Sequence, residues 1–101
     1  RVLREHKFAI LLPAGQFDET LSGADAEEEV LIQGIIDCAF EESGTMVLLD
    51  YKTDRVKNGE ELAERYRDQL DLYKVALEET LGLPVREVSL YSFHLGQEVR
   101  L

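Results

Sequence analysis

Two aspartates and one lysine in this sequence have the types and spacing of a cation-binding hydrolytic site. A β-hairpin is predicted around Ser43-Gly44. If its turn contains an even number of residues, two residues lie opposite each other when their numbers add to 87. Asp37 then lies opposite Asp50. Two carboxylates so placed repel one another unless a cation lies between them. A hard divalent cation such as Mg²⁺ accepts one or two carboxylates and keeps other positions for water and phosphate oxygens.

Lys52 adds an amine to the same face, because side chains alternate along a strand and Tyr51 then points away. The amine could orient or deprotonate a water, with a pKa lowered by burial or a nearby cation, or it could stabilise charge on a phosphate. Together the three groups predict metal-assisted phosphodiester hydrolysis. Two alternatives stay open: a turn of odd length would put the aspartates on opposite faces, and an Asp-Tyr-Lys triplet at a strand end is more often a solvated edge.

The elements that must position these residues follow from the hydrophobic pattern. Apolar positions three or four residues apart predict one long helix over 60–81, which ends at a Gly82 stop signal. Residues 16–29 are polar and acidic and predict a surface loop. Strand patterns occupy 2–12, 30–40, 45–50, 85–93 and 97–101.

Both arms of the predicted hairpin, 30–40 and 45–50, are apolar on both faces. This pattern is typical of a sheet that other layers cover on both sides. The expected fold is therefore α/β, with a mixed, mainly antiparallel central sheet and the helix 60–81 packed on it.

Length and charge limit the class of protein. The 101 residues fit one domain, and a hydrophobic fraction of 45% is enough for a core. With 21 acidic and 11 basic residues the net charge is −10. A free-standing basic nucleic-acid binder is excluded, because such a charge repels phosphate unless a metal or a partner offsets it.

Cys38 is the only cysteine, which excludes an intramolecular disulfide and a multi-cysteine metal site and favours a reducing compartment. No apolar run approaches the roughly 18 residues of a membrane span. The chain has no initiator Met and has strand-like sequence at both ends. We therefore expect residues 1–101 to be one domain of a longer polypeptide.

Several sequence blocks resemble the PD-(D/E)XK nuclease superfamily. They match the order and spacing of the family and cover nearly the whole chain: Arg4-Glu5, Gln33-Gly34-Ile35-Ile36-Asp37, Leu48-Leu49-Asp50-Tyr51-Lys52-Thr53-Asp54, Gln69 with Tyr73, and Leu90-Tyr91-Ser92-Phe93-His94. Within the superfamily the sequence is most similar to the AddA-type nuclease domains of RecB-like helicase-nucleases. The resemblance implies a restriction-endonuclease-like core.

The resemblance also implies a Mg²⁺-dependent deoxyribonuclease, with Mn²⁺ as a substitute and without an iron-sulfur cluster. Asp37 and Asp50 would be metal ligands, the backbone carbonyl of Tyr51 would be a further ligand, and Lys52 would be the catalytic lysine.

Gln69 and Tyr73 lie one helical turn apart, and the resemblance gives them contacts that steady the active site or the DNA backbone. Glu5 matches a glutamate that the family carries on the strand before the acidic pair and could support the site, although an exposed strand glutamate is nearly as common. Tyr66 shares the helix stripe and is expected to be core packing.

The family pattern begins with a helix that supplies a His or Glu metal ligand, and this sequence starts at the strand that follows. That helix and its ligand are therefore expected to be missing. His6 is too close to the first strand to replace the ligand, and a lone strand histidine is usually on the surface. His94 ends a strand and is expected to be structural.

For the parent protein the resemblance implies the exonuclease domain of an ATP-dependent helicase-nuclease in double-strand break repair and recombination. DNA and an AddB-like partner protein would be bound, another domain would handle ATP, and the location would be the bacterial cytoplasm without membrane attachment. Without the upstream helix the isolated chain is expected to bind metal weakly and to cleave poorly or not at all, and it is expected to bind DNA feebly. Two rivals remain: a catalytically silent nuclease-fold module that docks proteins through its acidic face, and a plain small α/β domain.

Overall fold

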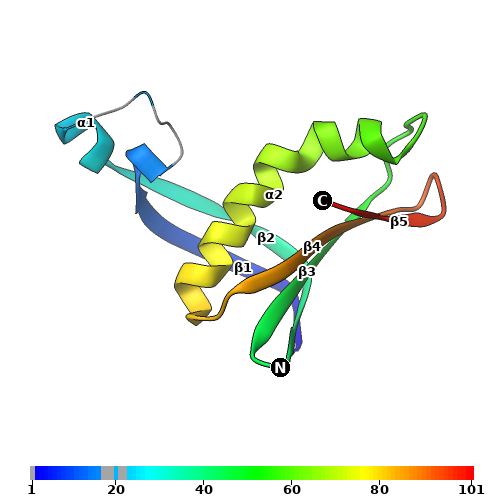
Figure 1. The fold of residues 1–101 in the computed structure, drawn as a ribbon, viewed down its shortest axis with the longest axis horizontal. Helices are drawn as coiled ribbons and strands as arrows, with labels where there is room; N and C mark the ends of the chain where they lie inside the picture. The colour runs from blue at the N-terminus through cyan, green and yellow to red at the C-terminus, as the bar shows by residue number, and fades with distance from the viewer. Residues whose placement is uncertain (1, 17–19, 21–22) are drawn as a thin grey trace.

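Five strands form a single sheet whose spatial order follows the chain (Figure 1). The computed structural model describes residues 2–16, 20 and 23–101. The elements are β1 (Val2–Pro13), the 3-10 helix η1 (Ala14–Gln16), α1 (Ala24–Glu27), β2 (Glu29–Glu42), β3 (Thr45–Lys52), α2 (Gly59–Leu81), β4 (Val85–Ser92) and β5 (Gln97–Arg100).

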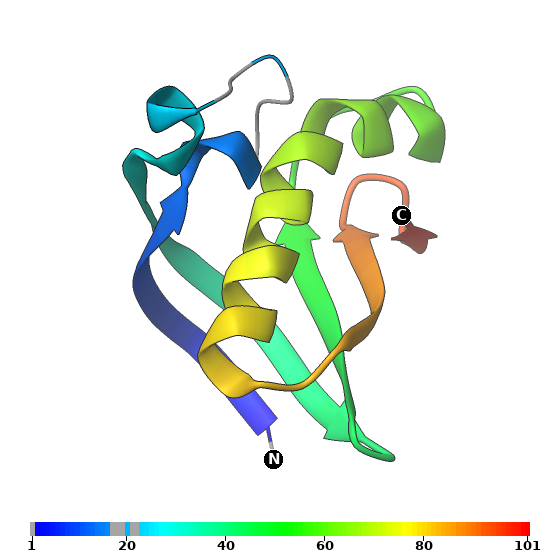
Figure 2. The ribbon, with the colours of Figure 1, turned by 60° about the vertical axis from the view of Figure 1, so that its left-hand side comes forward.

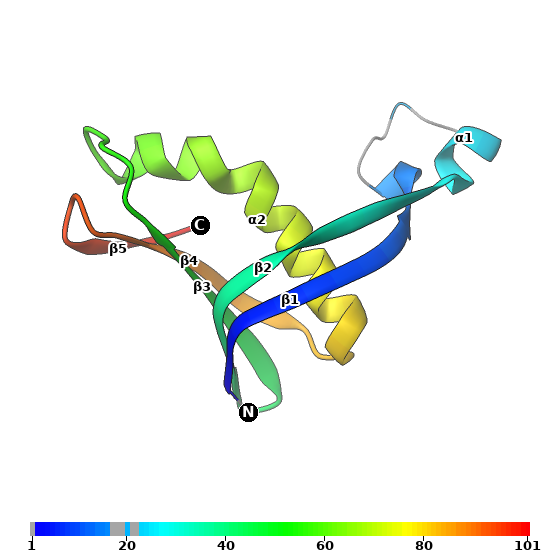
Figure 3. The same cartoon turned by 180° about the vertical axis from the view of Figure 1, so that it is seen from behind.

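The sheet is mixed and mainly antiparallel, as predicted. β1 with β2, β2 with β3 and β4 with β5 pair antiparallel, whereas β3 and β4 pair parallel. A parallel pair requires a crossover connection, and α2 supplies it. Figure 2 shows α2 lying across one face of the sheet, and Figure 3 shows the strands from the opposite face. No helix in the described part of the chain is long and apolar enough to cross a membrane.

The hairpin turn between β2 and β3 has two residues, so the prediction of an even turn is confirmed. Ser43 and Gly44 both have positive φ, at 53° and 78°, as the tight turns of two-residue hairpins require. The paired residues add to 87 from Glu42 opposite Thr45 to Cys38 opposite Leu49. The predicted register is therefore correct.

The long helix begins at residue 59 and ends at 81, one residue longer than predicted. The Asn58 side chain accepts a hydrogen bond from the Glu61 amide at 2.9 Å, and the Glu61 carboxylate accepts one from the Lys57 amide at 2.9 Å. These bonds satisfy amides at the start of the helix that have no helical partners. At the other end Gly82 has a φ of 70° and donates its amide to the Glu78 carbonyl.

The segment 16–29 is not only a loop, so that prediction was partly wrong. Residues 24–27 form the short helix α1, and the Ala14 amide donates to the Glu28 carbonyl at 2.8 Å, which closes the excursion between β1 and β2. The positions 17–19, 21 and 22 of the predicted loop lie outside the described residues.

The core lies between α2 and the sheet in two adjoining clusters. One contains Ile36, Ala39, Met46, Leu48, Leu77 and Val85. The other contains Val56, Leu62, Leu70 and Leu90. Tyr73 packs against both clusters and joins them.

The opposite face of the sheet is not covered by any described residue, so the expectation of layers on both faces stays a prediction for the parent protein. Leu11 and Leu31 pair on that face and are each 55% exposed, and Ile35 is exposed as well. A strand that is apolar on both faces can be buried on both faces. The described residues contain a single long helix, which buries one of them.

Candidate active site at the fork of the sheet

The sheet divides beside Asp37 and Asp50. Cys38 opposite Leu49 is the last pair between β2 and β3. Beyond this pair β2 continues with β1, and β3 continues with β4 as far as Lys52 opposite Ser92. The two strand pairs diverge from the hairpin end in Figures 1 and 3. The two aspartates therefore occupy the first row at which β2 and β3 separate.

Asp37 replaces a ladder hydrogen bond at this fork. Its Oδ2 accepts a hydrogen bond from the Tyr51 amide at 3.0 Å, which ties the strand carrying Asp37 to the strand carrying Asp50. The two carboxylates therefore lie close together, as predicted, at the position where the two strands of the hairpin separate. Such a position leaves room between strands that a continuous ladder would fill.

Asp50 is only 4% exposed, and its Oδ2 lies 2.8 Å from the Nζ atom of Lys52. Burial raises the pKa of Asp50 to about 6, and the hydrogen bond and negative charge of Asp37 contribute to this rise against the opposing effect of Lys52. The carboxylates are therefore close enough to repel, as the sequence predicted.

Lys52 keeps its proton in this site. Partial burial lowers its pKa, but the hydrogen bond and charge of Asp50, with smaller contributions from Tyr66 and Asp37, outweigh this, so the pKa is raised above its ordinary value. Burial therefore acts in the expected direction, but the direct contact with Asp50 favours the charged amine more than desolvation opposes it, and the net shift is upward. An ammonium suits charge stabilisation rather than proton abstraction.

Tyr66 does more than pack, and sequence reasoning missed its role. The Lys52 Nζ atom lies 4.0 Å from the centre of the Tyr66 ring, within the range of a cation-π contact. The Tyr66 hydroxyl donates to the Asp54 carboxylate at 2.8 Å. Arg65 pairs with the same carboxylate at 2.9 Å and with Glu61 at 3.4 Å.

These contacts hold the Lys52 amine between an acid and an aromatic ring. The hydrogen bonds from Arg65 and Tyr66 lower the pKa of Asp54, whereas burial and then Asp54 raise the pKa of Tyr66. The only sequence signal for the contact between Tyr66 and Lys52 was Asp54, at the end of the block that contains Lys52. Its partner lies 12 residues away on α2, a separation that no local pattern encodes.

Gln69 and Tyr73 form a pair on α2 that reaches β2. The Gln69 amide donates to the Tyr73 hydroxyl at 3.2 Å, and the Tyr73 ring meets Phe8 edge-on at 5.1 Å. A Cβ atom at Gly34 would lie 2.5 Å from the Tyr73 hydroxyl oxygen, so the glycine makes room for the tyrosine. The structure thus places the pair beside β2, three residues before Asp37, where the two side chains bond to each other rather than to the carboxylates.

Glu5 lies next to Asp37 across β1 and β2, between the paired rows of Arg4 with Cys38 and His6 with Ile36. Both acids line one open hollow of about 680 Å³, together with Arg4, Cys38 and Tyr51. Glu5 has a φ of 47°, which interrupts the ladder at this row. The structure therefore places Glu5 beside the candidate site, and its role there stays a prediction.

The two histidines differ in their distance along the strands from the acid pair: His6 pairs with Ile36, the residue before Asp37, in the ladder between β1 and β2. His6 is on β1 and His94 is exposed in the turn between β4 and β5. Within residues 2–16, 20 and 23–101 no three His, Cys, Asp or Glu side chains converge as a metal-binding group.

The acid pair fits a hard cation that keeps most of its water. Mg²⁺ is held in proteins by one or two carboxylates together with water and substrate oxygens, so two aspartates are sufficient. Repulsion from Asp37 helps to raise the pKa of Asp50, and a divalent cation would relieve this repulsion. Asp37 and Asp50 are therefore the described side chains that could hold such an ion.

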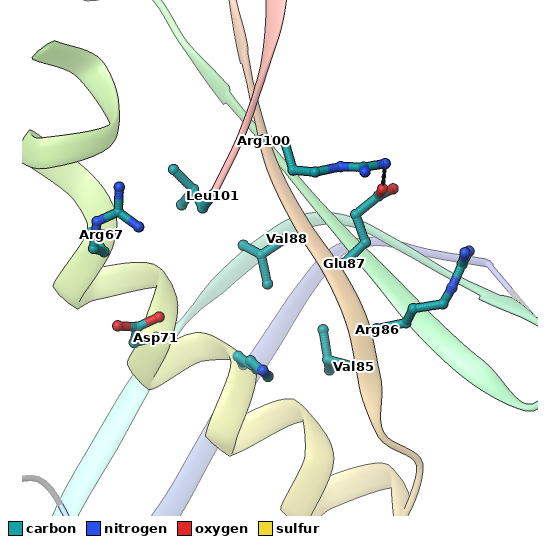
Figure 4. Close-up of a pocket in the computed structure, with 9 residues that line it drawn as sticks. Arg67, Asp71, Val85, Arg86, Glu87, Val88, Arg100 and Leu101 are labelled. Atoms are coloured by element: carbon teal, nitrogen blue, oxygen red, sulfur yellow. Dashed lines mark ion pairs between the residues drawn. The ribbon is translucent and has the colours of Figure 1, made fainter. Parts of the chain in front are cut away.

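A second hollow, of about 280 Å³, lies between α2 and the strands β4 and β5 (Figure 4). Val85 and Val88 point toward α2, whereas Arg86 and Arg100 extend on the other side of β4. Arg86 pairs with Glu42, and Arg100 pairs with Glu87. Asp71 is the one carboxylate on the helix side of this hollow among the described residues. This hollow lacks paired acids and is not the candidate active site.

Comparison with known proteins agrees with this geometry. The family model described as PD-(D/E)XK nuclease superfamily matches residues 3–99. The chain is 48% identical over 103 aligned positions to the ATP-dependent helicase/nuclease A-subunit of Alkaliphilus oremlandii, and 45% identical over 104 positions to that of Clostridium perfringens strain SM101; both alignments cover all of this chain.

A third relative, the protein of the same name from Desulforudis audaxviator, is 50% identical over 97 positions and matches 94% of this chain. The chain spans only 8% of the length of each of these three curated relatives. The family match covers nearly the whole chain, and the mixed sheet with its crossover helix is consistent with the restriction-endonuclease-like fold. This chain belongs to the PD-(D/E)XK nuclease superfamily.

Proposed function

We propose that this chain is a Mg²⁺-dependent DNA exonuclease domain of an ATP-dependent helicase-nuclease. The observation that carries the proposal is the convergence of Asp37, Asp50 and Lys52 at the fork between β2 and β3. Two acids and one amine at a splayed strand end are the groups that metal-assisted phosphodiester hydrolysis needs.

Asp37 and Asp50 are proposed as ligands of Mg²⁺ or Mn²⁺, with the backbone carbonyl of Tyr51 as a further ligand. The bound cation would polarise the phosphodiester and lower the pKa of a coordinated water. Lys52 is the catalytic lysine. Its ammonium lies 2.8 Å from Asp50 and is suited to hold a phosphate oxygen and to stabilise the negative charge that grows there.

The remaining residues position the reacting groups. The Tyr66 ring holds the amine of Lys52 in place, and Asp54 holds the hydroxyl of Tyr66. Gln69 and Tyr73 present an amide and a hydroxyl beside β2, where they would steady the DNA backbone. Glu5 would support the site from β1.

In the parent protein we place this domain in double-strand break repair and recombination, in the bacterial cytoplasm. Another domain would handle ATP, and an AddB-like protein would be the partner. The relatives, named as ATP-dependent helicase/nuclease proteins, support this assignment. The net charge of −10 implies that other domains supply the basic surfaces that guide DNA to the site.

Calorimetric titration of the chain with Mn²⁺ tests the site. We expect binding that Asp50→Ala abolishes and Asp37→Ala weakens, because each substitution removes a carboxylate that the ion needs. Asp71→Ala is the matched control, since it removes one exposed carboxylate that lines a different hollow. Absence of Mn²⁺ binding in the unsubstituted chain would favour the silent docking module instead.

A further inference from the structure

The side chains of β1 and β2 change faces at one place along the strands. Ile36 and Ala39 belong to the same core cluster, although they are three residues apart on β2. Leu3 and Phe8 both pack against that cluster, although they are five residues apart on β1. Residues on one face of a regular strand are separated by an even number of positions. The alternation of side chains is therefore interrupted once in each of the two strands.

The interruption coincides with the row in which Glu5 lies opposite Asp37, and we call these two residues the switch row. The pairs immediately before and after this row have residue numbers that add to 42, and the numbers of Glu5 and Asp37 add to the same value. No residue is inserted in either strand, which excludes a β-bulge. Glu5 has a φ of 47°, so its backbone leaves the extended region at this row.

Glu5 holds this left-handed conformation at a cost. Among the non-glycine residues that the structure describes, only Ser43 also has a positive φ, and the hairpin turn requires it there. Glu5 lies inside the 12-residue strand β1, where no turn requires it. Such a conformation costs a residue with a Cβ atom roughly a factor of ten in the folding equilibrium constant. It persists only where the surrounding structure imposes it.

The switch row turns the side chain of Asp37 sideways. In a regular strand the side chains stand roughly perpendicular to the sheet. The Asp37 Oδ2 atom instead accepts a hydrogen bond from the Tyr51 amide at 3.0 Å, so the carboxylate extends along the sheet toward β3. Asp50 directly precedes Tyr51 on that strand. The interrupted alternation therefore directs Asp37 to the strand that carries the second acid.

The two strands have to reverse together, because they pair on both sides of the switch row. Side chains directly opposite each other in an antiparallel pair lie on the same face. If β2 reversed without β1, the next pair would have one side chain in the core and the other on the opposite face. The positive φ of Glu5 supplies the reversal of β1 and so permits the reversal of β2 at Asp37.

We propose that Glu5 is a positioning residue that acts through its left-handed backbone, which directs the Asp37 carboxylate into the fork between β2 and β3. The inference rests on the proposed function, because Asp37 is a proposed metal ligand. It differs from support by the Glu5 carboxylate, since it assigns the effect to the backbone conformation that the residue at position 5 allows.

Glycine and valine at position 5 test the backbone role, because both lack a carboxylate. Glycine adopts a positive φ freely, whereas a β-branched residue strongly disfavours it. In urea unfolding, Glu5→Gly should have a folding equilibrium constant at least about five-fold higher than Glu5→Val. At Lys7, an exposed residue in a regular row of β1, valine should be more stable than glycine. The same order at both positions would refute the switch row.

The Tyr51 amide reports the direction of Asp37 in the metal-free chain. Hydrogen exchange by NMR should show this amide protected in Glu5→Gly and exchanging at least about ten-fold faster in Glu5→Val and in Asp37→Ala, which removes the acceptor. If Glu5→Val does not fold, Glu5→Ala replaces it, because alanine also has a Cβ atom but is smaller. Equal protection of Tyr51 in the glycine variant and in the valine or alanine variant would overturn the proposal.

Mn²⁺ titration separates this proposal from the proposed function. Glu5→Gly should bind Mn²⁺ at least about ten-fold more tightly than Glu5→Val, the usual effect of misplacing a metal ligand. The expected exchange of Tyr51 without Mn²⁺ binding to the unsubstituted chain would reject the metal site and keep the switch row. Mn²⁺ binding of equal affinity in the two variants would reject the role of Glu5 alone.

Discussion

Asp50 is the residue at which burial and charge oppose each other most strongly. It is nearly inaccessible, it lies beside a second carboxylate, and it has one lysine as its counter-ion. A carboxyl group in these surroundings holds its proton more tightly in the folded chain than in the unfolded chain. The metal-free fold must therefore lose stability when Asp50 ionises.

Asp50→Asn should flatten the pH dependence of stability in the metal-free chain. The pKa of Asp50 rises from 3.8 when unfolded to about 6 when folded, so its contribution is fully present below pH 3.8 and is lost as pH rises through 6. The loss is on the order of 3 kcal/mol in the free energy of unfolding. Urea unfolding in EDTA at several pH values between these limits measures it.

The control for this experiment is Asp71→Asn, which removes one exposed carboxylate from α2. Its pH profile should run parallel to that of the unsubstituted chain. If Asp50→Asn also runs parallel, Asp50 is not the group that destabilises the fold near neutral pH, and the repulsion assigned to the acid pair is absent.

At the scale of elements, the contact between α2 and β2 depends on one glycine. Tyr73 crosses from the helix to the strand and fills the space that a side chain at Gly34 would need. The same tyrosine joins the two core clusters and receives the hydrogen bond from Gln69. The position of the Gln69–Tyr73 pair relative to the fork is therefore set by packing at Gly34.

Gly34→Ala should lower the free energy of unfolding by about 1–3 kcal/mol, the usual cost of overpacking. The added methyl would lie 2.5 Å from the Tyr73 hydroxyl oxygen and 2.7 Å from Cζ, so the ring has to move. In a Tyr73→Leu background the same change should cost much less, because leucine does not extend as far. A double-mutant cycle by urea unfolding measures this coupling, and strictly additive effects would contradict the contact.

The hairpin could be predicted from sequence because its register depends only on local features. Ser43-Gly44 fixes a two-residue turn, and every pair up to Cys38 and Leu49 follows from it. The helix 59–81 could be predicted for the same reason, since its cap, its stripe and its stop are all local.

The fork and the support of Lys52 could not be predicted, because they depend on distant segments. β3 pairs with β4 from Met46 to Lys52 and continues with β4 after its pairing with β2 has ended at Leu49, and the pairing with β4 becomes possible only after α2 has crossed the sheet. The contact of Tyr66 with Lys52 and Asp54 likewise requires α2 to be docked. The raised pKa of Lys52 follows from that three-dimensional arrangement and not from the Asp-Tyr-Lys triplet.

At the scale of the whole molecule, the net negative charge opposes the DNA binding that the proposed function requires. The chain carries a net charge of −10, with 21 acidic residues against 11 basic ones. The hollow at the fork contains one free cation among its described lining residues, Arg4, with Lys52 across the strand. Contact with DNA therefore has to come from the metal site and from the cations beside it, because the net charge opposes long-range attraction.

The salt dependence of DNA binding should show this balance. A protein that neutralises six to ten phosphates loses about 10³- to 10⁵-fold in affinity between roughly 50 and 200 mM salt. Arg4 and Lys52 are the described cations near the strand, so the affinity for an oligothymidylate should fall by less than about ten-fold over that range. Screening of the net negative charge reduces the fall further. Fluorescence anisotropy in Ca²⁺ at a series of salt concentrations measures the slope.

Arg4→Gln tests whether Arg4 makes a phosphate contact at the fork. Removing one phosphate cation should make the logarithmic salt slope shallower by about 0.7, the value for one contact to a single strand. A steep slope in the unsubstituted chain that Arg4→Gln leaves intact would mean that phosphates bind to a surface other than the hollow at the fork.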